Sequence, residues 1–184
     1  MTEQDYDKYK QKAMATFAGG CFWCMEPPFD AEPGVLETIV GYTGGSTKNP
    51  TYKHVSAGGS GHAESIRIIY DPEVVSYERL LEIFWKNIDP LDPGGQFCDK
   101  GSQYRSAIFY HTEEQKMLAE LSRKQIEESD SLPGLIVTEI VSASIFYPAE
   151  KHHQDYYKKN PLRYKFYRRT CRRDKRLAEL WKAN

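Results

Sequence analysis

The sequence has no long apolar run. No stretch of it approaches the roughly 20 consecutive apolar residues that a membrane-spanning helix requires. Residues 1–12 are polar and lack the apolar centre of a signal peptide. We therefore expect no membrane association and a cytoplasmic location.

Neither sign of charge is in excess, since the 184 residues carry a formal net charge of -1. This balance gives no whole-chain reason to expect nucleic acid or an acidic membrane as a partner. Basic residues gather near the C-terminus, over residues 168–176, but Asp174 interrupts them and Glu179 follows. We interpret this stretch as a solvated helix end with salt bridges, and we expect a monomer that binds no nucleic acid.

Cysteine is scarce, with 4 residues, and the chain has no internal repeat or low-complexity tract. In a cytosolic protein, cysteines serve more often as reactive thiols or metal ligands than in a structural disulfide framework. The length fits one domain with a substantial core. We expect a polar lead-in over residues 1–12 and a single domain over residues 13–184.

Hydrophobic periodicity and turn residues predict alternating strands and helices. The expected strands are 14–18, 35–42, 63–70, 104–110 and 135–145, and the expected helices are 21–30, 76–88 and 112–128, before a helical or irregular tail. Pro27 and Pro28 make the end of the first helix doubtful, because proline removes a helical hydrogen bond. Two long loops, 43–61 and 89–101, connect core elements. This order predicts an α+β fold with one sheet covered by helices.

Cys21 stands in the segment Gly19-Gly20-Cys21-Phe22-Trp23-Cys24, where a strand turns sharply into a helix. Glycines permit such a turn. The free N–H groups of a helix start favour a thiolate and so lower a thiol pKa. Cys21 is therefore a candidate nucleophile, and the alternative is a buried structural cysteine.

Cys24 lies three residues after Cys21, on the same face of the predicted helix. A Cys-x-x-Cys pair at a helix start is typical of redox sites. Zinc is the rival reading, but a structural zinc site needs about four ligands, and Cys98 and Cys171 stand alone in the sequence.

Several other residues could complete a site around Cys21. Glu64 begins a half-buried strand, and a carboxyl group in apolar surroundings stays protonated and can act as an acid. Phe22 and Trp23 are either core residues or an apolar wall beside the thiolate. Tyr52 and Tyr104 belong to the two long loops, but the local sequence does not single them out among 13 tyrosines.

Five motifs together resemble one family. They are Gly20-Cys21-Phe22-Trp23, Gly41-Tyr42-Thr43-Gly44-Gly45, Asn49-Pro50-Thr51-Tyr52, Gly61-His62-Ala63-Glu64 and Gly101-Ser102-Gln103-Tyr104-Arg105-Ser106. In this order they resemble the peptide methionine sulfoxide reductases of the A type, from about Thr16 to Trp181.

The resemblance implies a ferredoxin-like core and reduction of the S epimer of methionine sulfoxide, free or in proteins. It implies thioredoxin as the reductant, with no metal or other cofactor. It also assigns roles: Cys21 is the nucleophile, Glu64 the acid, Tyr52 and Tyr104 the oxygen-side donors, and Phe22, Trp23 and Asp99 contact the substrate.

The resemblance does not assign the thiol that resolves the oxidised nucleophile, because this chain departs from many relatives. Those relatives have glycine at the position of Cys24 and resolve with cysteines in a glycine-rich tail. Here the tail around Cys171 contains no glycine over residues 166–174. We therefore expect Cys24 to resolve Cys21, with Cys171 and then Cys98 as alternatives.

Two other functions stay open at this point. One is a general dithiol oxidoreductase, which the Cys-x-x-Cys pair alone would support. The other is a zinc-binding interaction module that uses Cys21 and Cys24.

Overall fold

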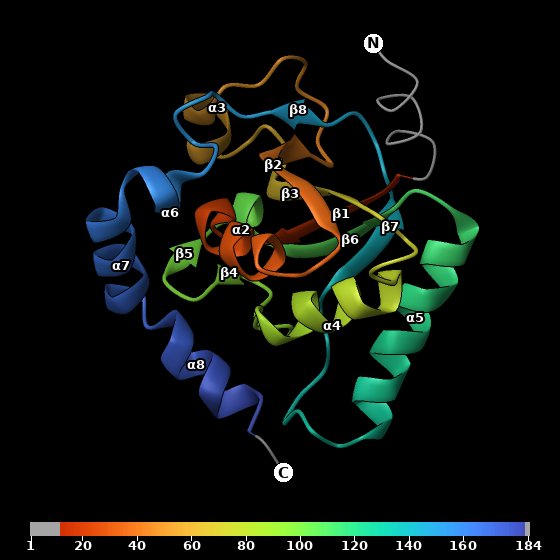
Figure 1. Cartoon of the computed structure of the whole chain (residues 1–184). Coiled ribbons are helices and arrows are strands. Elements are labelled where there is room, and N and C mark those ends of the chain that lie inside the picture. Colours follow the sequence, from red (N-terminus) through yellow and green to blue (C-terminus); the bar gives the residue numbers. More distant parts are fainter. Residues whose placement is uncertain (1–11, 183–184) are drawn as a thin grey trace.

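Residues 12–182 are described by the computed structural model, in which a six-stranded sheet organises the chain (Figure 1). The expected lead-in lies, except for Lys12, outside the described residues. The strand order is β7-β6-β1-β3-β2-β8. Their bounds are β1 Ala13–Gly19, β2 Val35–Thr43, β3 Ala63–Tyr70, β6 Ser106–Tyr110, β7 Glu139–Ser142 and β8 Tyr147–Pro148.

The four inner strands, β6, β1, β3 and β2, are antiparallel to one another and carry two interleaved βαβ units. Helix α2 (Phe22–Asp30) connects β1 to β2, and helix α4 (Tyr77–Lys86) lies between β3 and β6. This is the split βαβ, ferredoxin-like arrangement. The expected α+β class is thus confirmed, with β7 added parallel to β6 through helix α5 (Glu113–Glu128) and β8 added beside β2.

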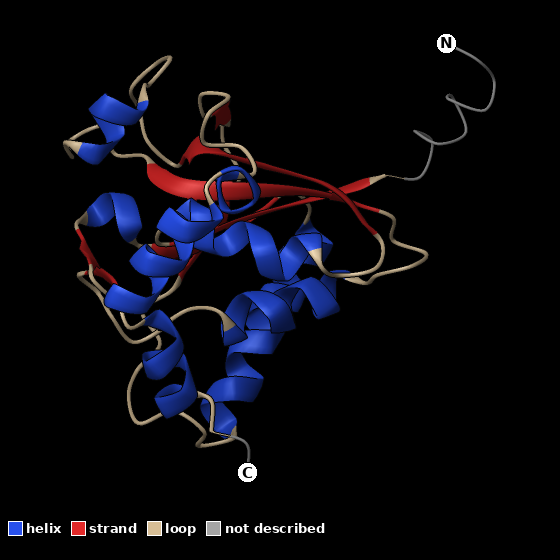
Figure 2. Cartoon of the chain, turned by 60° about the vertical axis from the view of Figure 1, so that its left-hand side comes forward, coloured by secondary structure: helices blue, strands red, loops and turns tan. Residues whose placement is uncertain are grey.

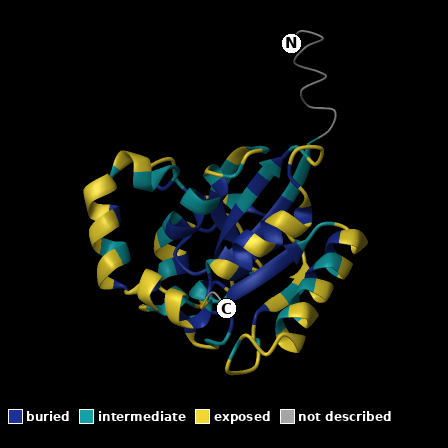
Figure 3. Cartoon of the chain, turned by 60° about the horizontal axis from the view of Figure 1, so that its bottom comes forward, coloured by how far each residue is buried: buried dark blue, intermediate teal, exposed yellow. Residues whose placement is uncertain are grey.

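Helices α2, α4 and α5 gather on one side of the sheet (Figure 2). The main core lies between them and the strands, where Phe17 stacks on Phe29 and Phe84 with ring centroids 5.7 and 4.8 Å apart. Figure 3 shows the inner strands buried and the outward faces of the helices exposed. On the other side of the sheet, the Arg67 guanidinium lies 4.2 Å from the ring centre of Phe146.

The predicted helix starts at residues 76 and 112 are found. The side chains of Ser76 and Thr112 accept hydrogen bonds from the N–H groups of Arg79 and Gln115, as N-cap residues do. The Gln115 amide oxygen in turn accepts from the N–H of His111, so this side chain also fixes the residue before the cap.

The predicted helix over 21–30 is confirmed as α2, which continues through Pro27 and Pro28 because buried residues such as Met25 and Phe29 hold it against the core. The structure corrects four other local predictions. The first long loop contains a short helix, α3 (Tyr52–Ser56), capped by Thr51.

The second long loop contains a two-residue hairpin, β4 (Gly95–Gln96) and β5 (Asp99–Lys100). Tyr104 ends a 3-10 turn (η1, Ser102–Tyr104) that follows Gly101, at φ +123°, so the next strand begins only at Ser106. The last predicted strand shrinks to β7, since the Val137 N–H bonds the carbonyl of Pro90 rather than a neighbouring strand.

The tail is helical and runs back over the end of the sheet where β1 stops (Figure 1). It comprises α6 (Tyr156–Lys159), α7 (Pro161–Thr170) and α8 (Arg173–Leu180). Across residues 12–182, no helix is long and apolar enough to cross a membrane.

Candidate active site

The turn between β1 and α2 presents Cys21 at the N-cap position of α2. Gly20 has φ +81°, and a Cβ atom there would lie 2.5 Å from the Cβ of Gln96. A Cβ on Gly19 would lie 2.6 Å from the Met25 sulfur. Gly20 is therefore favoured both by its positive φ and by the lack of room for a side chain, and Gly19 by the lack of room alone.

Strand periodicity brings Glu64 to the same place. Glu64 shares its face of β3 with Ile66 and Ile68, which are part of the core under the helices. Because Phe17 pairs with Ile66 in antiparallel register, continuing this register places Glu64 opposite Gly19. The N–H of Phe22, in the first turn of α2, donates to Glu64 Oε2 at 3.1 Å.

Glu64 is 2% exposed. Burial raises the pKa of its carboxyl group to about 8, against the hydrogen bond from Phe22, which lowers it. The group is therefore protonated at neutral pH and can donate a hydrogen bond or a proton.

Two phenols face the same pocket from separate elements. Tyr52 begins α3, and its N–H donates to Glu150 Oε1 at 2.8 Å, which fixes the start of that helix. Tyr104 comes from the turn before β6. Burial raises the pKa of Tyr52 to about 12 and raises that of Tyr104 as well, so both hydroxyls keep their protons.

Phe22 and Trp23 supply an aromatic wall. Phe22 is buried, and its ring centre lies 6.4 Å from that of Tyr52. Trp23 is half-buried and stacks on Tyr156, with ring centroids 3.9 Å apart. The Trp23 indole N–H also donates to His153 Nδ1 at 3.2 Å, so the indole ring is held in place on two sides.

The remaining wall comes from Asp99, on β5, and Tyr167, on α7. The Tyr167 hydroxyl donates a hydrogen bond to Asp99 Oδ2. Burial raises the pKa of Asp99, whereas the hydrogen bond from Tyr167 opposes that shift. Sequence reasoning did not identify Tyr167, and its sequence signal is weak: it is one of many tyrosines and lies one helical turn before Cys171.

Cys24 lies beside Cys21 in a small cluster with Tyr164, and both thiols are free. The expected lowering of the Cys21 pKa is not found: burial raises the pKa of Cys21, and its hydrogen bond to Cys24 raises it further. The same hydrogen bond lowers the pKa of Cys24 to about 6, assisted by the charges of Arg173 and Arg168. At neutral pH the two thiols therefore share one proton and one negative charge.

Arg173 is a fully buried cation that sequence reasoning assigned to a solvated helix end. Its guanidinium donates to the carbonyls of Gly19, at 3.0 Å, and Asn87, at 2.6 Å. Its Nε has no hydrogen-bond partner among the described residues. Arg173 thus fixes the end of β1 just before the nucleophile turn and supplies positive charge near the thiols.

The structure also corrects the expectation for the other two cysteines. We expected reactive thiols or metal ligands, but Cys98 and Cys171 are joined in a disulfide that spans 73 residues of sequence. Their sulfurs and an Asp99 carboxylate oxygen lie within 4.8 Å of one another, the one grouping of three potential metal ligands within residues 12–182. Two of those three donors are the bonded sulfurs, which are not thiolates, so they do not form the thiolate set that zinc prefers.

The pocket above Cys21 is small, with a volume of about 60 Å³. Its lining residues are Cys21, Phe22, Trp23, Tyr52, Glu64, Asp99, Tyr104 and Tyr167. All of these except Tyr167 are candidates from the sequence, and they come together from five separate stretches of the chain. Cys24 lies beneath this pocket rather than in its lining, and Cys98 and Cys171 lie outside it.

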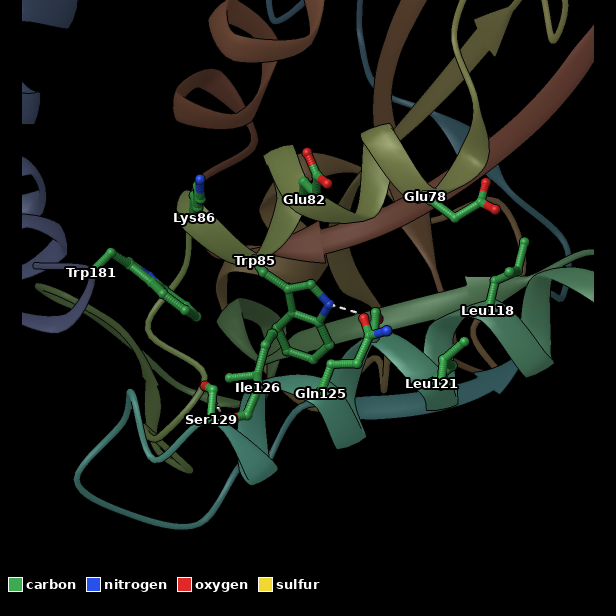
Figure 4. Close-up of a pocket in the computed structure, with 11 residues that line it drawn as sticks. Glu78, Glu82, Trp85, Lys86, Leu118, Leu121, Gln125, Ile126, Ser129 and Trp181 are labelled. Carbon is green, nitrogen blue, oxygen red and sulfur yellow. Dashed lines mark hydrogen bonds between the residues drawn. The ribbon is translucent and has the colours of Figure 1, made fainter. Parts of the chain in front are cut away.

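A larger hollow of about 460 Å³ lies elsewhere, between α4 and α5 (Figure 4). Apolar side chains such as Trp85, Leu121 and Ile126 line it, and the Trp85 indole N–H donates to Ser122 Oγ at 2.9 Å. It contains no cysteine, whereas the smaller pocket combines a thiol, a neutral carboxyl group and two phenols. The smaller pocket is therefore the candidate active site.

Comparison with known proteins identifies the family of this chain. The family model for peptide methionine sulfoxide reductase matches residues 13–184. A peptide methionine sulfoxide reductase MsrA of Bacillus licheniformis is 52% identical over 94% of this chain and 95% of its own length. One from Listeria monocytogenes is 50% identical over 99% of both chains.

Solved structures show the same fold. Reduced Mxr1 from Saccharomyces cerevisiae superposes with a TM-score of 0.76 at 30% identity, covering 84% of this chain and 88% of Mxr1. Methionine sulfoxide reductase A of Corynebacterium diphtheriae gives a TM-score of 0.74 at 33% identity, covering 83% of this chain and 77% of its own. The chain belongs to the peptide methionine sulfoxide reductase family, as a thiol-based enzyme of the MsrA type.

Proposed function

We propose that the enzyme reduces the S epimer of methionine sulfoxide, free or in proteins, with Cys21 as the nucleophile. One observation carries this assignment: the Cys21 sulfur shares a small pocket with a buried, protonated Glu64 and two phenols. A sulfoxide needs a soft nucleophile at sulfur and proton donors at oxygen, because an oxide ion is a poor leaving group. The pocket supplies both.

In the first step, Cys21 passes its proton to Cys24 and attacks the sulfoxide sulfur as a thiolate. The two thiols are hydrogen-bonded and share one negative charge, so the proton only has to cross that one hydrogen bond. Glu64 protonates the oxygen, while the hydroxyls of Tyr52 and Tyr104 donate hydrogen bonds to it. The sulfoxide sulfur is reduced to a thioether, which leaves as methionine, and Cys21 is oxidised to a sulfenic acid.

The aromatic wall selects the substrate. The methyl group of the sulfoxide packs against Phe22 and Trp23, while its oxygen faces the donors on the other side. Asp99, held by Tyr167, faces the substrate from the third side. The sulfur of methionine sulfoxide is a stereocentre. A pocket that fixes the places of its methyl group, its oxygen and the rest of the methionine side chain therefore accepts only one epimer.

In the second step, Cys24, which holds the proton it took from Cys21, attacks the sulfur of the Cys21 sulfenic acid. An S–S bond forms, the S–O bond breaks, and the hydroxyl group takes the proton from Cys24 and leaves as water. Cys24 is favoured because it is a free thiol in contact with Cys21, whereas Cys98 and Cys171 are bonded to each other. Thioredoxin then supplies the electrons that return this disulfide to two thiols, and a structure of the yeast relative Mxr1 in complex with Trx2 supports this choice of partner. We place this cycle in the cytoplasm, with the enzyme as a monomer.

The test is turnover of the separated S and R epimers by the wild type and by Cys21→Ser. The wild type should reduce the S epimer alone, and Cys21→Ser should reduce neither while keeping its fold. Cys24→Ser is the matched control: it should release one methionine per chain and then stop. Sustained turnover by Cys21→Ser, or equal use of the R epimer, would contradict the proposal.

A further inference from the structure

The catalytic thiols are difficult for another protein to reach. Cys21 is 5% exposed and Cys24 is 2% exposed. Thiol–disulfide exchange requires the attacking sulfur to make a bond to one of the disulfide sulfurs. A folded protein dithiol therefore cannot reduce a Cys21–Cys24 disulfide unless α7 or the β4–β5 hairpin, which line the pocket through Tyr167 and Asp99, moves aside.

The disulfide between Cys98 and Cys171 lies close to this site but is more accessible. Its accessible half is Cys98, which is exposed on the turn between β4 and β5, whereas Cys171, the C-cap of α7, is buried. The Asp99 carboxylate connects the two places, since it lies within 4.8 Å of both sulfurs and also lines the Cys21 pocket. Tyr167 packs on the cluster of Cys21 and Cys24, donates to Asp99, and lies one turn before Cys171.

The surroundings of Cys171 favour it as a leaving thiolate. The backbone N–H of Cys98 donates to Cys171 Sγ at 3.2 Å. Five cationic side chains lie close to Cys171 in the sequence and line one surface hollow with Asp174, which pairs with Arg168: Lys165, Arg168, Arg169, Arg172 and Lys175. An N–H donor and a surplus of nearby positive charge stabilise a thiolate, and a stabilised thiolate leaves faster in exchange. A reductant that attacks the exposed Cys98 sulfur would thus expel a stabilised Cys171 thiolate.

We propose that Cys98 and Cys171 form a second redox-active pair, which passes electrons from a protein dithiol at the surface to the buried Cys21–Cys24 disulfide. This proposal rests on the proposed function. First, the external dithiol reduces the Cys98–Cys171 bond to two thiols and becomes a disulfide itself. Next, the Cys171 thiolate attacks the Cys21–Cys24 disulfide, and Cys98 attacks the mixed disulfide. This reforms the Cys98–Cys171 bond and returns Cys21 and Cys24 as thiols, so two electrons move in each step.

The arrangement in the structure is the product of that second step, with the catalytic pair reduced and the second pair oxidised. The Tyr167 ring packs on the catalytic thiols, so the exchange requires the end of α7 to shift. Reduction of the Cys98–Cys171 disulfide makes that shift easier, because it removes the covalent link between the end of α7 and the β4–β5 hairpin. The hydrogen bond between Tyr167 and Asp99 then remains as a link between the hairpin and α7.

The test is the yield of methionine in the absence of any reductant, with the sulfoxide in excess. Enzyme with all cysteines reduced should form about two methionines per chain, because two dithiols are consumed in turn. Enzyme with the Cys98–Cys171 bond intact should form about one, and so should reduced Cys98→Ser/Cys171→Ser. A yield of about one from fully reduced wild type, with Cys98 and Cys171 still alkylatable, would overturn the relay. No methionine from any form would instead overturn the proposed function.

A second arm separates the relay from a structural role and from direct resolution by Cys171. The serine double variant should keep the wild-type rate of its single turnover and of turnover with dithiothreitol, but lose at least roughly tenfold with thioredoxin. A slower single turnover would indicate that the bond only holds the pocket together. Reduced Cys24→Ser should stop at about one methionine. A yield of two from this variant would show that Cys171 attacks Cys21 directly.

Discussion

Replacing Glu64 by glutamine tests the central electrostatic feature of the site. The glutamine keeps the size of the side chain and an oxygen that can accept the N–H of Phe22, which now lies 3.1 Å from Glu64 Oε2. It removes the transferable proton. We expect kcat/KM for methionine sulfoxide to fall roughly 10²- to 10⁴-fold, the usual contribution of a general acid.

The pH dependence gives the sharper signature. The pKa of Cys24, about 6, sets an acid limb, because below it both thiols are protonated. The pKa of Glu64, about 8, sets an alkaline limb, because above it the acid is ionised. Wild-type kcat/KM should therefore be bell-shaped, with its maximum between these values. Glu64→Gln should lose the alkaline limb and keep the acid limb.

The same substitution should stabilise the fold. Burial raises the pKa of Glu64 from 4.5 to about 8, so the stability this group contributes is complete below 4.5 and is lost as pH rises through 8. At about pH 7 the cost of keeping the carboxyl neutral is about 3 kcal/mol, at 1.36 kcal/mol per pKa unit. Glutamine has no such cost, so we expect the free energy of unfolding to rise by an amount of this order at neutral pH.

The assays are initial rates across the pH range and urea unfolding at neutral and acidic pH. Glu37→Gln is the matched control, since Glu37 is exposed on the neighbouring strand β2, and it should change neither result. An alkaline limb that persists in Glu64→Gln would refute the assignment of that limb to Glu64. An unchanged free energy of unfolding would refute the raised pKa.

Three further predictions follow from the same geometry. Arg173→Met should raise the pKa of Cys24 and shift the acid limb of the pH profile to higher pH, whereas Arg173→Lys should keep the Cys24 pKa close to its wild-type value. Thiolate absorbance measured against pH checks this, and an acid limb that does not shift in Arg173→Met would exclude an electrostatic role for Arg173. Gly20→Ala should destabilise the fold by roughly 1–3 kcal/mol more than Gly58→Ala. Both positions have positive φ, but only at Gly20 would the new Cβ meet a neighbouring atom, the Cβ of Gln96, at 2.5 Å. Urea unfolding compares the two variants, and equal losses of unfolding free energy would contradict the clash. Trp23→Ala should raise KM for the sulfoxide more than it lowers kcat, because it removes packing against the methyl group of the bound substrate. In steady-state kinetics, a lower kcat with an unchanged KM would instead mean that the indole acts only in the transition state.

Local features of the sequence determined the elements and half of the site. Alternating apolar residues over 63–70 predicted strand β3 with its bounds, and the same alternation put Glu64 on the buried face. Two glycines before Cys21 predicted the sharp turn, and Ser76 and Thr112 marked helix starts. These predictions succeed because each depends on interactions between residues a few positions apart.

Other features were decided by contacts between distant segments. The residues of strand β7 could have extended from 135 to 145, but the available partner, β6, pairs with only Glu139–Ser142. Tyr167 enters the pocket because α7 packs against Cys21 and Cys24 at the start of α2, and no local pattern distinguishes it from other tyrosines. Arg173 reads as a surface cation in the sequence, yet it is buried beneath the nucleophile turn.

The cysteines show the division most clearly. The spacing of Cys21 and Cys24 alone predicted that the two sulfurs meet, since residues three apart share a helix face. The bond between Cys98 and Cys171 spans 73 residues and depends on where the β4–β5 hairpin and the end of α7 are held. The sequence by itself therefore determined that Cys21 and Cys24 lie side by side at a helix start. Tertiary packing alone decided which distant side chains surround that thiol, how burial sets the pKa of Glu64, and how a second cysteine pair comes to lie beside the first.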